Sequence, residues 1–328
     1  VLSTLDDSTR TGLDHIVMVP MPIEASKAFD SDIVGILDDY AFLRWTSNLE
    51  KMEIQHLVRN VRRSALDYET TQRLHQTAVI HWETLAETAD DHIILLYHRI
   101  ASLEDGIDAQ LDLEMERLVE THSGAFSVLL EQAIKASPKP SHLHYLAGKV
   151  AIERCEPEHA RRHLESIEDL AESRQVAFGL AMLDGRVEQA EEIIEAGLSS
   201  EVQSETNRMA IAAAARRLDD RIHNQTDTTL SGDVKHYLSK VKLPQDAPEE
   251  RSVTLVAMSM IQHALALQEE DFEKAQRLRN SLAGIGGLAQ PLLQSMAAKA
   301  TLLKAKSDPE VAQGLEEMHL AIEAQTNS

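Results

Sequence analysis

The chain has 328 residues, of which 43 % are hydrophobic and 4 % aromatic, and its formal net charge is −22. This apolar content excludes a disordered chain, and the abundance of alanine, leucine, glutamate and glutamine predicts an all-α fold. So acidic a surface repels the phosphates of nucleic acids and anionic lipids, so we expect a protein or peptide partner with a basic surface and no nucleic acid.

Residues 1–42 are predicted to form an extended N-terminal arm or linker. Residues 15–24 are apolar and β-branched, and Pro20 and Pro22 cannot lie inside a helix, which leaves room for one short edge strand at most. So apolar a segment must dock on the chain's own helices or on a partner, and the acidic stretch ahead of it favours the partner. The candidate binding residues of the arm are Ile16, Val17, Val19 and Ile23.

Residues 43–106 are predicted to form an N-terminal helical segment. Leu49, Met52, Leu57 and Val61 fall roughly on one stripe and predict a single helix over 43–65. Asp90 or Asp91 is expected to cap a later helix. The other helices expected up to the proline-rich stop at 135–142 cover residues 68–88, 92–100, 107–120 and 125–136.

Residues 107–328 carry a recurring turn followed by a small residue. The segments "CEPEHARRHL", "DGRVEQAEEI", "EEDFEKAQRL" and "SDPEVAQGL" align at Ala160, Ala190, Ala275 and Ala312, and a looser copy places Tyr237 in that position. Two antiparallel helices joined by a short turn approach closely only where a small side chain lies at their crossing. We therefore expect helical hairpins that stack on one another.

These hairpins resemble tetratricopeptide repeats. "FSVLLEQAIKASPKP" is similar to the second helix of such a repeat, with Ala133 as the small residue and Pro138 as the terminator, and the next copy matches at Ala147, Gly148, Ala160 and Leu164. The spacings between successive crossing positions, 30, 47, 38 and 37 residues, depart from the 34 of the family. The resemblance implies a degenerate α-solenoid, and the alternative is an ordinary helical bundle.

The resemblance also implies a function, which is non-catalytic binding of a partner through a groove lined by the first helix of each hairpin. Such a chain would serve as a scaffold or adaptor. The alternative is a structural subunit of a large multiprotein assembly. The matching groove positions are His142, Tyr145, Lys149, Ile152, Gln175 and Met182.

The sequence offers little for catalysis, and we expect no enzyme, no cofactor and no metal. Three Glu-x-x-His pairs, Glu53/His56, Glu156/His159 and Glu316/His319, leave a helical metalloenzyme as the weaker alternative, although chance alone produces about as many. The single cysteine, Cys155, excludes an intrachain disulfide and a thiolate cluster.

No apolar run is long enough to span a membrane, and we expect no membrane insertion. The chain begins at Val1 instead of methionine, which suggests a fragment of a longer protein. We therefore expect a cytoplasmic protein, or a periplasmic or membrane-tethered one if a signal or anchor precedes this segment.

Overall fold

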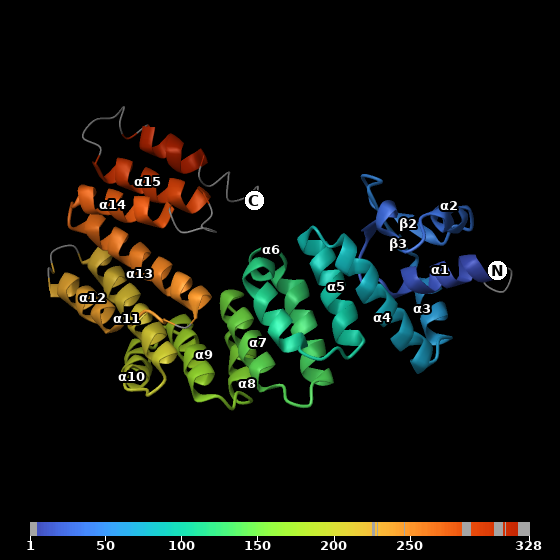
Figure 1. The fold of residues 1–328 in the computed structure, drawn as a ribbon, viewed down its shortest axis with the longest axis horizontal. Coiled ribbons are helices and arrows are strands. Elements are labelled where there is room, and N and C mark those ends of the chain that lie inside the picture. The colour runs from blue at the N-terminus through green and yellow to red at the C-terminus, as the bar shows by residue number, and fades with distance from the viewer. Residues whose placement is uncertain are drawn as a thin grey trace. The chain divides into compact units, whose positions relative to one another are not determined.

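A computed structural model describes residues 5–224, 227, 229–245, 247–283, 290–304, 311 and 313–320. The predicted all-α class is confirmed, because helices make up most of the described chain and its strands are three short ones (Figure 1). The chain divides into two compact units, Val1–Gly185 and Arg186–Ser328. This division coincides with neither boundary of the predicted segments 1–42, 43–106 and 107–328.

In the first unit, helices and short strands are interspersed up to β3, and every described element after β3 is a helix. The elements are α1 (Asp7–Met18), β1 (Ile23–Glu24), a 3₁₀ turn (Ala25–Lys27), α2 (Asp32–Asp39), β2 (Leu43–Trp45), β3 (Lys51–Ile54), α3 (His56–Ser64), α4 (Tyr68–Leu85), α5 (Ala89–Ala101), α6 (Ile107–Ala136), α7 (Ser141–Glu153), α8 (Pro157–Leu164) and α9 (Leu170–Leu183).

The predicted extended arm is wrong over most of its length. Residues 7–18 form α1, which begins where the Asp6 side chain accepts a hydrogen bond from the backbone N–H of Thr9. Pro20 and Pro22 follow the end of this helix, so they limit its length without preventing it. The short edge strand is present as β1.

The predicted single helix over 43–65 is also wrong, because this segment forms β2, β3 and then α3. The three strands make an antiparallel sheet in the order β1-β3-β2, with Met52 opposite Ile23 on one side and Trp45 on the other. Met52 and Ile54 are buried and alternate with half-buried polar residues. This two-residue period is typical of a half-buried strand. The sequence analysis missed it because the apolar residues of the segment were fitted to a helical period.

The helices from α4 onward pack mainly on their neighbours in sequence, α4 on α5, α5 on α6, α6 on α7 and α7 on α8 (Figure 1). The 30 residues of α6 would span about 45 Å if straight. The structure instead has non-helical φ and ψ at His122, and Asp112 near the start of α6 lies beside His142 near the start of α7. The chain therefore reverses within α6, as the two helices predicted over 107–120 and 125–136 require.

The recurring turn has a shared backbone conformation. Cys155, Gly185 and Glu270 have φ of +56°, +72° and +57°, and each precedes an aligned alanine by five residues. Those alanines, Ala160, Ala190 and Ala275, are all buried, as predicted. Ala160 packs with Ala151 of α7 and Leu180 of α9. Tyr237 is half-buried, and Ala312 lies outside the described residues.

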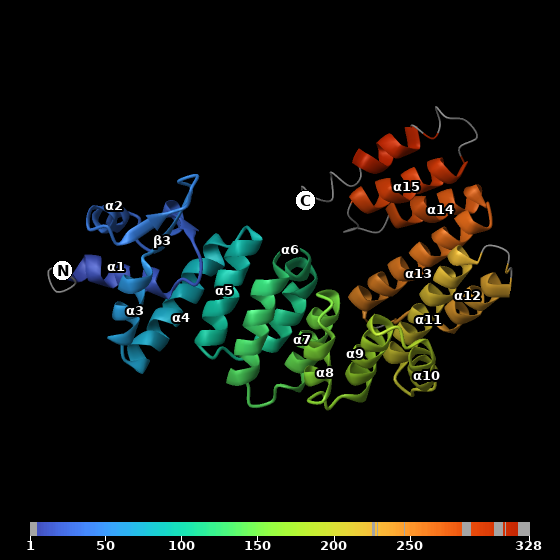
Figure 2. The same cartoon turned by 180° about the vertical axis from the view of Figure 1, so that it is seen from behind.

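The second unit repeats this arrangement: α11 packs on α10, α12 and α13, and α14 packs on α13 and α15 (Figure 2). Ala214 and Leu218 of α11 share a core with Val234 and Leu238 of α12. Its helices are α10 (Val187–Leu198), α11 (Gln203–His223), α12 (Thr229–Lys240), α13 (Pro248–Gln268), α14 (Phe272–Ala283) and α15 (Gln290–Lys304), and residue 311 and residues 313–320 are also helical.

Candidate functional site

The residues assigned to a partner-binding arm lie inside the protein. Ile16, Val17 and Val19 are buried at the end of α1 and just after it, and Ile23 is buried in β1. All four belong to one apolar core with residues of α2, the sheet and α4. They are therefore withdrawn as an interaction site, because the chain's own elements cover them.

Four of the six predicted groove residues come together between α7 and α9. His142 Nδ1 lies 2.6 Å from Glu172 Oε1, and the Tyr145 hydroxyl donates a hydrogen bond of 2.7 Å to Gln175 Oε1. The Lys149 ammonium lies 5.2 Å from the centre of the Tyr145 ring, a cation–π distance. The structure thus brings these four residues together, with Tyr145 buried in the core and His142, Lys149 and Gln175 half-buried.

The other two predicted residues do not join this group. Ile152 is half-buried and packs in the core around Ala160, whereas Met182 is exposed near the end of α9.

Sequence reasoning missed two acidic members of the group, Asp112 and Glu172. Asp112 Oδ2 lies 3.9 Å from Nε2 of His142, so both imidazole nitrogens face a carboxylate. Asp112, His142 and Glu172 are separated by 30 residues each, as are Tyr145 and Gln175. The 30-residue spacing of Ala160 and Ala190 was the signal that could have found them. We call Asp112, His142, Glu172, Tyr145, Gln175 and Lys149 the polar ladder.

Two glycines allow α7 and α9 to approach closely enough for these contacts. A Cβ on Gly148 would lie 3.0 Å from Val176 Cγ1, and one on Gly179 would lie 2.7 Å from Ile152 Cδ1. Larger side chains at either position would push the two helices apart and separate the residue pairs of the ladder.

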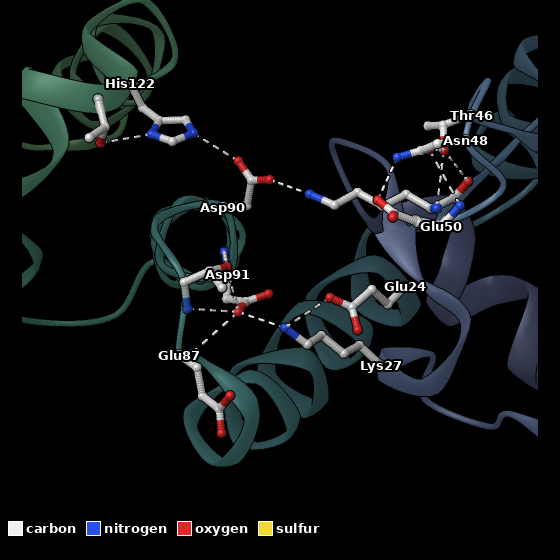
Figure 3. Close-up of polar contacts among 12 residues, drawn as sticks. Glu24, Lys27, Thr46, Asn48, Glu50, Glu87, Asp90, Asp91 and His122 are labelled. Atoms are coloured by element: carbon white, nitrogen blue, oxygen red, sulfur yellow. Dashed lines mark hydrogen bonds and ion pairs between the residues drawn. The ribbon is translucent and has the colours of Figure 1, made fainter. Parts of the chain in front are cut away.

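A second polar cluster joins the sheet to the hairpins (Figure 3). Asp91 near the start of α5 accepts hydrogen bonds from Lys27 Nζ at 2.8 Å and from the backbone N–H of Thr88 at 2.9 Å. Burial opposes ionisation of Asp91, but these hydrogen bonds outweigh it and lower the pKa of its carboxyl to about 2. Thr88, and neither predicted aspartate, is the N-cap of α5, with Asp91 completing a capping box.

Asp90 links the same helix to two other elements. One carboxylate oxygen contacts Lys51 of β3, and the other lies 2.8 Å from His122 Nε2 at the bend of α6. All of these charged groups are satisfied within the chain, so the cluster fixes the position of the sheet and leaves no free group for chemistry.

The groups that favoured a metal site are dispersed. Within the described residues, no three His, Cys, Asp or Glu side chains gather as metal ligands would. Glu156 and His159 lie 3.4 Å apart, but Glu156 also pairs with Arg154 at 2.8 Å. Buried histidines contact each other instead, with 2.9 Å between the Nδ1 atoms of His75 and His98.

Two of the three arginines in the basic stretch at residues 58–63 bond other parts of the chain. Nε and Nη2 of Arg62 both donate to the Asp14 carboxylate, the second at 2.8 Å, and Arg63 donates to the Tyr97 hydroxyl. Among the described residues, no helix combines the length and apolar character needed to cross a membrane.

Comparison with models of known protein families, with curated proteins and with solved structures finds no match in any of the three. The resemblance to tetratricopeptide repeats therefore remains a hypothesis that rests on the residues that suggested it.

Proposed function

We propose that this chain is a non-catalytic scaffold or adaptor that binds a partner protein or peptide with a basic surface along the polar ladder. The observation that carries the proposal is the ladder itself, a row of carboxylates, an imidazole, a phenol and an amide across α6, α7 and α9. Repeated hairpins that present one row of side chains are typical of α-solenoids that bind peptides.

Charge supports the choice of partner. Asp112 is 52 % exposed and Glu172 is 20 % exposed, so a cationic side chain can approach the ladder from solvent. The net charge of −22 adds a long-range attraction that raises the rate of association with a basic partner.

A role as a structural subunit of a multiprotein assembly is the second candidate, because α3 and the start of α4 expose Leu57, Val61 and Tyr68. A scaffold and a subunit differ in whether the partner dissociates. We propose the scaffold because the polar ladder suits reversible binding better than an apolar interface does.

The test uses a fluorescein-labelled 12-residue peptide of lysines and alanines, measured by anisotropy in 50 mM salt. The double variant Asp112→Asn/Glu172→Gln should bind it roughly fivefold more weakly than the unaltered chain, because two carboxylates beside the bound cations are lost. The matched control is Asp39→Asn/Glu69→Gln, which removes the same charge from exposed positions outside the ladder.

Equal weakening by both double variants would show that the peptide senses only overall charge. Unchanged binding by the ladder variant would remove the proposal.

A further inference from the structure

His142 is the member of the polar ladder that meets a carboxylate at each of its ring nitrogens. Its Nδ1 lies 2.6 Å from Glu172 Oε1 of α9, and its Nε2 lies 3.9 Å from Asp112 Oδ2 of α6. A carboxylate only accepts hydrogen bonds, so the short contact requires a hydrogen on Nδ1. Because a neutral imidazole has one N–H, its Nε2 is then an acceptor that faces a second acceptor.

This pair of acceptors lacks a donor. The 3.9 Å between His142 Nε2 and Asp112 Oδ2 is too long for a hydrogen bond. Within the described residues, Asp112 has no other ionic contact. A cationic nitrogen about 2.8 Å from both atoms would donate to each of them and offset the charge of the carboxylate.

The space between the two acceptors is open to solvent. The side chain of Asp112 is 52 % exposed and that of His142 is 33 % exposed. Lys149, the cation of the ladder, lies about two turns further along α7 with its ammonium over the Tyr145 ring, so it does not supply the donor. A cationic nitrogen from outside the chain can therefore reach both acceptors.

We propose that the space between His142 Nε2 and Asp112 Oδ2 binds a lysine ammonium of the partner, in competition with a proton. An ammonium is compact and carries three N–H groups, so a single nitrogen donates to two acceptors on different side chains. The inference rests on the proposed function, because it names the group through which the basic partner occupies the polar ladder.

A proton on Nε2 removes this site, because the lone pair that accepts from lysine is lost. The groups that face His142 are Asp112 from α6, Glu172 from α9 and the Tyr145 ring from α7 itself. A proton on the imidazole thus also cancels one of the two negative charges beside it. An imidazole gains its proton between about pH 8 and pH 5, whereas lysine stays charged throughout, so binding should weaken as the pH falls.

The experiment repeats the anisotropy titration of the lysine–alanine peptide in 50 mM salt, at pH 8 and at pH 6. It compares the unaltered chain with His142→Gln, whose amide takes up no proton in this range, and with Asp112→Asn. The matched control is His159→Gln, because His159 also lies beside a carboxylate, Glu156 at 3.4 Å, but on α8 outside the ladder. Circular dichroism at both pH values confirms that each variant is folded.

The unaltered chain and His159→Gln should each bind the peptide roughly fivefold more weakly at pH 6 than at pH 8. In His142→Gln this loss should shrink to less than about twofold, the effect of the other histidines on overall charge. Asp112→Asn should weaken binding at pH 8 and show the same small loss, and it serves alone if His142→Gln does not fold.

Equal pH dependence in His142→Gln and His159→Gln would overturn the lysine site and leave the basic-partner function standing. Equal binding by the unaltered chain at the two pH values would overturn it in the same way, as would unchanged binding by Asp112→Asn at pH 8. Failure of the unaltered chain to bind the peptide at pH 8 would overturn both proposals.

Discussion

The N-terminal region, residues 5–101, and the hairpins of α7 to α9 are stabilised in different ways. In the N-terminal region, decisive contacts join distant parts of the chain, as between Arg62 and Asp14 or Lys27 and Asp91. In the hairpins, small residues such as Ala160 and Gly148 pack on neighbours within about one repeat. The difference teaches that a local pattern predicts structure only where the packing partners are local too.

The largest expected effect concerns pH and the N-terminal side of this comparison. Burial, with a smaller contribution from the positive charge of Arg63, lowers the pKa of His75 to about 4 and that of His98 to about 3. The two rings face each other, and His15 and His81 also act on His98. In the unfolded chain these histidines take up protons below about pH 6.5.

Stability is therefore complete above pH 6.5 and is lost as the pH falls toward 4. Between pH 7 and pH 5 we expect a loss of about 4 kcal/mol, or about 2 kcal/mol for each histidine. Urea unfolding followed by tryptophan fluorescence reports the unfolding of the N-terminal region, because both tryptophans, Trp45 and Trp82, lie in it. An unfolding midpoint that does not move between the two pH values would contradict the prediction.

The next effect tests the hairpin side. Ala160→Trp and Ala190→Trp should each lower the free energy of unfolding by about 3 kcal/mol or more, because overpacking a core costs ~1–3 kcal/mol for smaller changes. Thermal melting followed by circular dichroism measures the effect. The matched control is Arg162→Trp, at an exposed position of α8. Melting of the two alanine variants at the temperature of the unaltered chain would show that these alanines are not at close crossings.

The smallest effect concerns the turns. Cys155 and Glu270 adopt the left-handed conformation, which costs a residue with a Cβ about 1–2 kcal/mol, and Gly185 occupies the same place in the turn between α9 and α10. Cys155→Gly and Glu270→Gly should each stabilise the chain by about 0.5–1 kcal/mol, after the entropy that glycine adds to the unfolded state is subtracted. Gly185→Ala should destabilise it by about 1 kcal/mol. Chemical denaturation measures all three, and destabilisation by Cys155→Gly would refute the shared turn.

The sequence allowed the hairpins and their buried alanines to be predicted, because a turn, a small residue and an apolar stripe all lie within one repeat. It did not allow the positive φ at Cys155 and Glu270 to be predicted, since the backbone there is set by the closing of the turn and not by residue preference. Four of the six ladder residues were predicted from the hairpin phase. Asp112 and Glu172 were missed because the 30-residue spacing of Ala160 and Ala190 was not applied to the first helices on either side of His142.

The predictions of an extended arm and of a single helix over 43–65 failed for a physical reason. Pro20 and Pro22 were taken to exclude a helix, although the cap at Asp6 begins one that ends before them. Met52 and Ile54 are buried on one side of β3 because β3 pairs with β1 and β2. A search for helical periodicity over residues 43–65 cannot detect this pairing. The buried carboxylates and histidines of the N-terminal region are fixed by partners between 23 and 64 residues away.

The constant offset between Asp112, His142 and Glu172 has a consequence for how such a chain can change in length. A block of 30 residues carries one complete step of the row, from a point on one first helix to the equivalent point on the next. Excising or duplicating such a block would shorten or extend the row by one position and leave the remaining steps in register. We therefore expect this part of the chain to tolerate changes of whole blocks, whereas one or two residues inserted inside one of these helices would rotate the side chains beyond the insertion away from the row.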